Sequence, residues 1–188
     1  MPASSSTNDR QASNSSRPLC PNCGEIGRPV HVVTLKHMVM PKFLDFVNKR
    51  GFAFCPTPDC QVVYFYADGG TLKKADLRIR VGLKETADPV PVCYCFGFTE
   101  RMLFEEVQTS GQSSIPQRIA AEIKADNCVC EVRNPQGSCC LGNVKAAVTR
   151  AQRDRRRDNP SSSPLTRDEH FSRCLLSRRT KLDENFDS

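Results

Sequence analysis

Cysteine is the residue whose spacing carries most of the chemistry in this chain. Ten of its eleven cysteines stand in five close pairs. Two thiols at such short spacing place their sulfurs around one small object. In a chain with no recognisable export signal, we expect that object to be a metal rather than a disulfide. The pairs are Cys20–Cys23, Cys55–Cys60, Cys93–Cys95, Cys128–Cys130 and the vicinal Cys139–Cys140.

The positions of the pairs predict two separate metal centres. Two pairs precede residue 61 and three follow residue 92. The first two pairs lie in loops beside expected strands and supply four thiolates, the ligand set of a closed tetrahedral zinc site. Such a site stabilises a small fold and leaves no open position for catalysis. The predicted zinc ligands are Cys20, Cys23, Cys55 and Cys60.

The second half offers six cysteines, which is more than four ligands require. An iron–sulfur cluster is larger than a single ion and needs four thiolates around it. Because vicinal side chains tend to diverge, we expect only one of Cys139 and Cys140 to bind, and the same argument applies less strongly to Cys128 and Cys130. Spacing alone leaves a second zinc open, because cysteine-rich loops suit either metal.

The remaining pattern predicts an α+β fold of two small modules, over residues 19–76 and 77–149. Thr99 stands where an N-cap would, Gly111 ends the helix that follows, and Ser114 to Gln117 has the form of a capping box. Alternating and β-branched residues predict strands at 30–34, 62–66 and 77–81, and amphipathic patterns predict helices at 41–50, 99–109, 115–126 and 143–156.

Composition places the excess charge and the disorder at the two ends. The net charge is +6, but residues 19–149 carry fifteen basic and thirteen acidic residues. Residues 1–18 are rich in Ser and Asn without an apolar run, so we expect a disordered tail and no signal peptide. Residues 150–188 are expected to form a charged, largely disordered tail. Its basic run Arg153–Arg157 favours a solvated end over a nucleic-acid surface.

The sequence contains neither a membrane-spanning pattern nor the common catalytic motifs. No apolar stretch approaches the roughly 18 residues needed to span a bilayer, so we expect no membrane insertion and a cytoplasmic location. No GxSxG, P-loop, HExxH or GxGxxG motif occurs, which favours a metal-binding carrier over an enzyme. Cys174, the unpaired cysteine, is expected to be an incidental free thiol.

Four motifs in order resemble the N-terminal domain of CopZ-type copper chaperones, over about residues 19–149. They begin at Cys20 (CPNCG), Phe54 (FCPTPDCQVVYF), Val92 (VCYCFG) and Cys128 (CVCE, followed by NPQGSCCLG). The resemblance implies zinc in the first half and a [2Fe–2S] cluster in the second. By that resemblance the cluster ligands are Cys93, Cys95, Cys130 and Cys140, with Cys128 and Cys139 as the alternatives.

The resemblance also implies a role in copper homeostasis, with Cu⁺ bound at most transiently. Full-length chaperones of this type carry a ferredoxin-like copper domain with a Met-x-Cys-x-x-Cys loop, which this sequence lacks. We therefore expect a copper-binding chaperone domain or a copper-transporting ATPase as a partner in trans. One-electron transfer that supports Cu(II) reduction is the leading hypothesis. The alternatives are a general [2Fe–2S] electron carrier or sensor, and a zinc-stabilised nucleic-acid-binding module.

Overall fold

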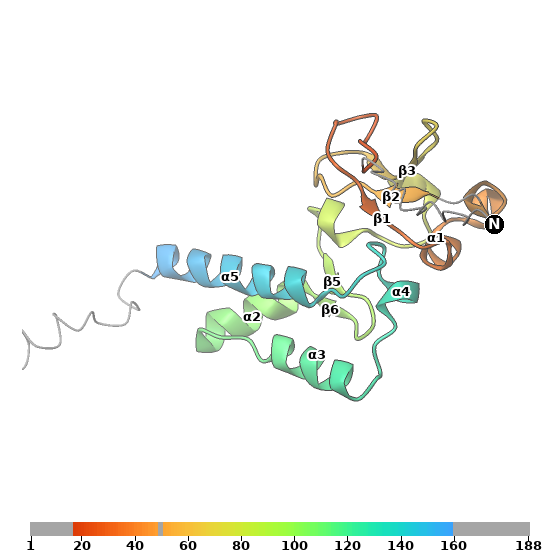
Figure 1. Cartoon of the computed structure of the whole chain (residues 1–188). Helices are drawn as coiled ribbons and strands as arrows, with labels where there is room; N and C mark the ends of the chain where they lie inside the picture. Colours follow the sequence, from red (N-terminus) through yellow and green to blue (C-terminus); the bar gives the residue numbers. More distant parts are fainter. Residues whose placement is uncertain (1–16, 49–50, 160–188) are drawn as a thin grey trace, which may run out of the picture.

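The computed structural model describes residues 17–48 and 51–159, which form two packed units (Figure 1). The expected tails at 1–18 and 150–188 fall mostly outside this range. The first unit is a small antiparallel sheet with one helix. The second is a β-hairpin followed by four helices. The mixed α+β class predicted from the sequence is therefore confirmed.

The sheet of the first unit has the order β1-β2-β3-β4. Its central strand β3 has Val, Tyr and Phe at every position and is buried along almost its whole length, as expected of a strand covered on both faces. Phe52 pairs with Tyr66 and Phe54 with Tyr64 across β2 and β3. The strand bounds are β1 Arg28–Pro29, β2 Phe52–Phe54, β3 Val62–Tyr66 and β4 Thr71–Lys73.

Helix α1 (Val32–Met38) covers this sheet, where the sequence predicted a strand over 30–34. That prediction was wrong, and only Val30 joins the sheet edge, through its N–H to the carbonyl of Phe52. The helix buries Leu35 and Met38 against the core of the sheet. Packing of this face outweighs the local preference of Val and Thr for extended backbone.

Two other predicted elements of the first half also differ in the structure. The helix expected over 41–50 is two separate 3₁₀ turns, at Pro41–Phe43 and Phe46–Asn48. The strand expected over 77–81 makes only one bridge, between Leu77 and Val39. Its alternating side chains are partly buried as predicted, but no neighbouring strand lies beside it in the described residues, so no ladder forms.

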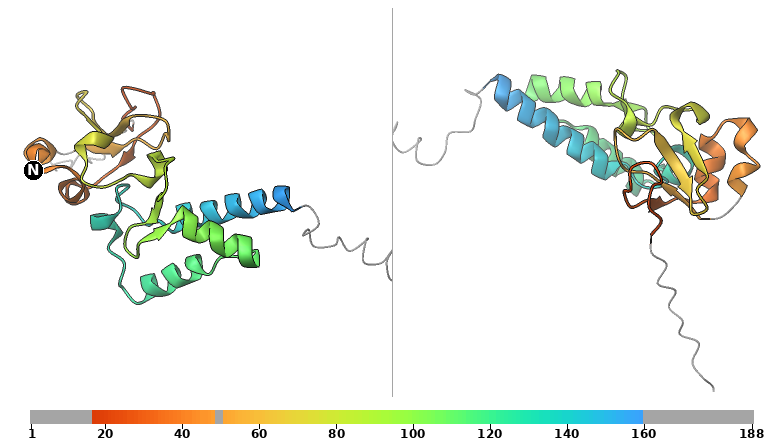
Figure 2. Two further views of the ribbon diagram at one scale, coloured as in Figure 1. Left: turned by 180° about the vertical axis from the view of Figure 1, so that it is seen from behind. Right: turned by 90° about the horizontal axis from the view of Figure 1, so that it is seen from above.

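The second unit begins with a hairpin of β5 (Pro91–Cys93) and β6 (Phe98–Thr99). Helices α2 (Glu100–Ser110) and α3 (Ile115–Lys124) follow, then the short α4 (Cys130–Arg133) and the long α5 (Leu141–Asp158). Figure 2 shows α5 running alongside α2 and away from the sheet unit. The helices share a core of apolar side chains: Leu103, Ile115, Ile119, Val144 and Ala147.

Start and stop signals of α2 agree with the sequence prediction. The Thr99 hydroxyl accepts a hydrogen bond from the N–H of Met102, which satisfies one free donor at the helix start. Gly111 closes the helix with a φ of 81°, a left-handed conformation that glycine adopts without steric cost. The helix predicted over 143–156 is also present, although α5 extends further, through Asp158.

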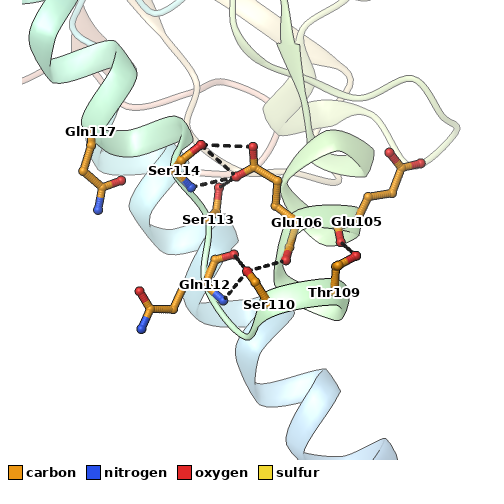
Figure 3. Close-up of a pocket in the computed structure, with 8 residues that line it drawn as sticks. All are labelled: Glu105, Glu106, Thr109, Ser110, Gln112, Ser113, Ser114 and Gln117. Carbon is orange, nitrogen blue, oxygen red and sulfur yellow. Dashed lines mark hydrogen bonds between the residues drawn. The ribbon is translucent and has the colours of Figure 1, made fainter.

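The N-terminus of α3 is capped in a different way from the predicted Ser114 capping box. The Ser114 side chain does not cap its own helix. Instead the Glu106 carboxylate on α2 accepts the Ser114 N–H at 2.7 Å and the Ser113 hydroxyl at 2.7 Å (Figure 3). An open polar pocket lies beside this corner, but its central acid is already engaged by these bonds. We therefore assign the corner to packing of α2 against α3.

The two units contact each other through α1 and α4, which lie side by side in Figure 1. No helix of the described residues is long and apolar enough to cross a membrane.

Candidate metal centres

The four predicted zinc ligands come from two loops at one end of the sheet. Cys20 and Cys23 stand in a tight turn where the N–H of Gly24 bonds the carbonyl of Cys20 at 2.8 Å. Cys55 directly follows β2, and Cys60 precedes β3. Because β2 and β3 are paired neighbours, the second loop is held at both ends and its two thiols face the first turn.

The sulfur distances in this group suit one tetrahedral ion. The sulfurs of Cys20 and Cys60 lie 3.9 Å apart, and those of Cys23 and Cys55 lie 3.6 Å apart. All four lie within 4.8 Å of one another. Tetrahedral zinc with Zn–S bonds of about 2.3 Å requires sulfur separations of about 3.8 Å. The donor set and its dimensions therefore fit Zn²⁺ without rearrangement of the loops.

Two polar side chains of the same loops contact the sulfurs. The Asn22 amide donates to the Cys60 sulfur at 3.2 Å, and the Thr57 hydroxyl lies 3.2 Å from the Cys23 sulfur. The hydrogen bond to Thr57 is the main cause that lowers the pKa of Cys23 to about 6. Burial instead raises the pKa of Cys55 to about 12. A metal must therefore displace the proton of Cys55, while Cys23 is already inclined to ionise.

Exposure shows how closed this group is. Cys20, Cys55 and Cys60 are buried, and only Cys23 is exposed. Apolar side chains, among them Ala53, Val62 and Phe65, surround the three buried thiols. This arrangement is suited to a structural role, because four thiolates fill the coordination positions of a tetrahedral zinc ion.

The second group of thiols lies where the hairpin meets the loop around α4. Cys93 ends β5 and Cys95 stands in the turn that follows. Cys130 begins α4, Cys128 stands two residues before it, and Cys140 precedes the first residue of α5. Segments more than thirty residues apart thus converge on one place, as the predicted two-loop arrangement requires.

Five sulfurs interact in this second group, which we call the array: those of Cys93, Cys95, Cys128, Cys130 and Cys140. The Cys130 sulfur lies 3.8 Å from that of Cys95 and 3.3 Å from that of Cys128, and Cys95 and Cys128 are 4.0 Å apart. Cys140 joins this group through its thiol, which interacts with the thiols of both Cys130 and Cys93. Only Cys95, Cys128 and Cys130 lie mutually within 4.8 Å. The full array is therefore larger than a single tetrahedral ion requires.

Proton sharing within this array divides the thiols into two kinds. The hydrogen bond from Cys140 is the main cause that lowers the pKa of Cys130 to about 5 and that of Cys93 to about 7. The same contacts raise the pKa of Cys140 itself. Burial raises the pKa of Cys95 to about 12. At neutral pH some thiols of the array are therefore ionised while others still carry their proton.

Of the favoured cluster ligands, Cys95 and Cys130 lie in one close group together with Cys128, and Cys140 interacts with both Cys93 and Cys130. Cys139, the other alternative, is exposed and lies outside both sulfur groups of the described residues. The expected divergence of the vicinal pair is therefore observed. Which four of the five thiols bind stays a prediction.

Residues that the sequence reasoning missed hold the loop between Cys128 and Cys140. The Thr34 hydroxyl on α1 donates to the carbonyl of Glu131, and the Tyr64 hydroxyl on β3 donates to that of Pro135, each at 2.6 Å. Thr34 and Tyr64 are completely buried. A buried hydroxyl needs a partner, but the sequence gives no sign of which one. The first unit thus positions a ligand loop of the second.

Comparison with known proteins agrees with this geometry. A family model described as a zinc binding domain, of the CopZ type, matches residues 17–78. The copper chaperone CopZ of Archaeoglobus fulgidus is 37% identical over 121 residues, which are 64% of this chain and 57% of that protein. The chain thus spans little more than half of this relative.

A solved structure extends the match across both units. The X-ray structure of the Archaeoglobus fulgidus CopZ N-terminal domain matches with a TM-score of 0.61 at 34% identity, over 68% of this chain and 95% of that domain. Sequence, fold and the first sulfur group therefore agree, and the chain belongs to the family of CopZ-type N-terminal zinc-binding domains.

Proposed function

We propose that this chain is a carrier with two metal centres, and that it serves copper handling without being an enzyme. Zinc occupies the first centre through Cys20, Cys23, Cys55 and Cys60 and stabilises the sheet unit. A [2Fe–2S] cluster occupies the second through four of its five thiols, with Cys93, Cys95, Cys130 and Cys140 as the favoured set. The observation that carries the proposal is the convergence of two sulfur groups of different size and shape.

The size of the second array supports a cluster over a second zinc. Five thiols are more than one ion uses, and they do not all lie within 4.8 Å of one another. A [2Fe–2S] cluster needs four thiolates, and the array offers two sets of interacting thiols, Cys93 with Cys140 and Cys95 with Cys128. Cys130 interacts with thiols of both sets. A cluster bound there supplies one-electron chemistry, which is sufficient to convert Cu(II) to Cu(I), the state that soft thiolates prefer.

The chain's own residues bind and shield the second centre. Arg133 donates to the carbonyl of Cys95 at 3.1 Å and ties α4 to the hairpin turn. Tyr94, between Cys93 and Cys95, accepts the N–H of Gly82 at 2.7 Å and so anchors the same turn. Cys95 and Cys128 stay partly exposed, which leaves this end of the array within reach of a partner.

The copper role rests on the relative that is named a copper chaperone. We place the stable copper site on a partner, because the two sulfur groups of this chain are assigned to zinc and to a cluster. The partner is a copper-binding chaperone domain or a copper-transporting ATPase. Copper is bound by this chain only transiently, as Cu⁺ on exposed thiolate sulfur.

Anaerobic mixing of the reduced protein with Cu(II) tests this function. A colour reagent specific for Cu(I) should report about one Cu(I) per reduced chain, because the cluster donates one electron. The matched control is the Cys95→Ser variant treated in the same way, which should yield much less. A reducible cluster that transfers no electron to Cu(II) would remove the copper role.

A general electron carrier is the second candidate, and the partial exposure of Cys95 and Cys128 favours it independently of copper. It predicts an intact, reducible cluster in a protein that neither binds nor exchanges Cu(I). The same experiment distinguishes the two functions.

A further inference from the structure

Lys84 is a buried lysine at the edge of the first metal centre. Its residue is only 5% exposed, and it stands in the 3₁₀ turn Gly82–Lys84 of the connection between the two units. The ammonium donates to the carbonyl of Thr57 at 2.7 Å and to that of Cys60 at 3.1 Å. It also lies 5.8 Å from the centre of the Phe54 ring. Lys84 therefore reaches back across the chain to the loop that carries Cys55 and Cys60.

This lysine has no carboxylate partner among the described residues. The neighbouring Glu85 pairs with Arg80 at 3.0 Å and with Lys74 at 3.5 Å. The Lys84 ammonium instead contacts two neutral carbonyls and an aromatic face. An ammonium removed from water without a counter-charge is costly, and lysine is almost never buried unless it is paired. We therefore expect a negatively charged group close to the Lys84 ammonium.

The first metal centre supplies that charge once its ligands are ionised. Four thiolates around one Zn²⁺ carry two negative charges in excess, in a pocket where three of the four cysteines are buried. A positive charge beside such a centre is attracted more strongly than it would be in water, because the surroundings are apolar. Thus the buried ammonium and the buried thiolates each offset the cost of burying the other.

We propose that Lys84 is a positioning residue of the zinc centre, which offsets part of the charge of the four-thiolate ion and clamps the Cys55–Cys60 loop. The proposal rests on the zinc assignment made above. The turn that carries Lys84 also contacts the second centre. Gly82 of this turn donates its N–H to the hydroxyl of Tyr94, which stands between Cys93 and Cys95. Removal of the lysine charge should therefore weaken zinc retention without touching a ligand.

A chelator competition at fixed pH and ionic strength measures this effect. The Lys84→Met variant keeps the length of the side chain and removes its charge and donors. We expect it to hold zinc about ten-fold to a hundred-fold more weakly, the range for residues that support a metal ligand. The matched control is Lys36→Met, an exposed lysine of the same unit, which should hold zinc as the wild type does.

A double-mutant cycle separates charge from packing. Cys23 is the exposed ligand, and Cys23→His converts the site to three thiolates and one neutral imidazole, a ligand set that zinc accepts. With one negative charge fewer, the same Lys84→Met change should cost clearly less zinc affinity than in the four-cysteine background. Circular dichroism of each variant with zinc bound verifies that the sheet unit is folded.

The outcomes are distinct. Zinc retention of Lys84→Met equal to the wild type would overturn the role of Lys84 and leave the zinc assignment intact. An equal loss in both backgrounds would assign the effect to the hydrogen bonds and packing that hold the Cys55–Cys60 loop, and it would overturn the role of the lysine charge. A wild-type chain that binds no zinc would instead overturn the assignment itself, and the proposal with it.

Discussion

At the scale of single residues, two neutral polar side chains contact the sulfurs of the first metal centre. Asn22 and Thr57 stand inside the two cysteine loops, and each places a polar group 3.2 Å from a ligand sulfur. Hydrogen bonds to a thiolate spread its charge and fix its direction, so these side chains belong to the metal site although they do not bind the metal.

The Thr57→Val variant should hold zinc about ten-fold more weakly than the wild type. Valine keeps the shape of threonine but removes the hydroxyl that favours the ionised form of Cys23. Chelator competition at fixed pH measures the change. Thr149→Val, an exposed hydroxyl on α5, serves as the control and should have no effect. Equal zinc affinity in all three proteins would show that the Thr57 contact is incidental.

Serine substitutions should distinguish the cysteines of the second array. Cys130 contacts Cys95, Cys128 and Cys140, so Cys130→Ser should lose most of the iron and sulfide after reconstitution. Cys139→Ser should keep both at the wild-type level, because Cys139 is exposed and outside the array. Iron and sulfide analysis of the two variants, purified side by side, measures the difference. Loss of the visible colour in Cys139→Ser would contradict this arrangement.

Most of the candidate ligands could be predicted from the sequence, because paired cysteines are a local signal. Their supporting residues could not, because Lys84 and Tyr64 act far along the chain from the residues they contact. A lysine in a polar connection carries no mark that it will be buried. Only the fold, which brings Gly82–Lys84 back to the Cys55–Cys60 loop, shows its position.

At the scale of secondary-structure elements, the corner between α2 and α3 depends on the carboxylate of Glu106. Partial burial raises the pKa of Glu106, but hydrogen bonds from Ser113 and Ser114 outweigh it and hold the pKa below its ordinary value of 4.5. The carboxylate therefore stabilises the start of α3 in its ionised form. That contribution is present above the unfolded-state pKa and is lost as the pH falls through the lower pKa of the folded state.

Glu106→Ala should reduce the free energy of unfolding by about 1 kcal/mol at pH 7, the usual cost of a lost helix cap. The difference from the wild type should narrow as the pH falls below about 4.5, because the wild-type acid then loses its charge. Urea unfolding followed by circular dichroism measures both effects. Glu105→Ala, its more exposed neighbour on α2, is the control. A constant difference at every pH would mean that the charge of Glu106 contributes nothing.

Elements with strong local signals were predictable, and those set by packing were not. The strand over 62–66 and the helix between Thr99 and Gly111 have clear pattern and capping residues, and both predictions are confirmed. The segment 30–34 has equally strong β-branched residues, yet Val32–Met38 is a helix. Its buried Leu35 and Met38 pack on the sheet, and this long-range contact decides the outcome.

The two units depend on each other at the scale of the whole molecule. Thr34 and Tyr64 of the sheet unit bond the loop that carries the ligands of the second centre. Zinc stabilises the sheet unit and therefore also stabilises the surface against which that loop is placed.

Tyr64→Phe should loosen the second centre and leave the first unchanged. It leaves the buried carbonyl of Pro135 without this partner, at a cost of about 1–2 kcal/mol. We expect iron to be released to a chelator several-fold faster than from the wild type, with unchanged zinc affinity in the same sample. The zinc reading is thus an internal control. Equal iron release would show that the loop holds its position without Tyr64.

The most direct test of the two proposed metal centres is a count of the metals in one anaerobically purified sample. Iron, acid-labile sulfide, zinc and copper are measured together with the visible spectrum before and after reduction. One zinc site and one [2Fe–2S] cluster require about two irons, two sulfides and one zinc per chain, with a visible band that bleaches on reduction. Two zincs and no colour, even after attempted cluster reconstitution, would contradict it and leave a zinc-stabilised binding module.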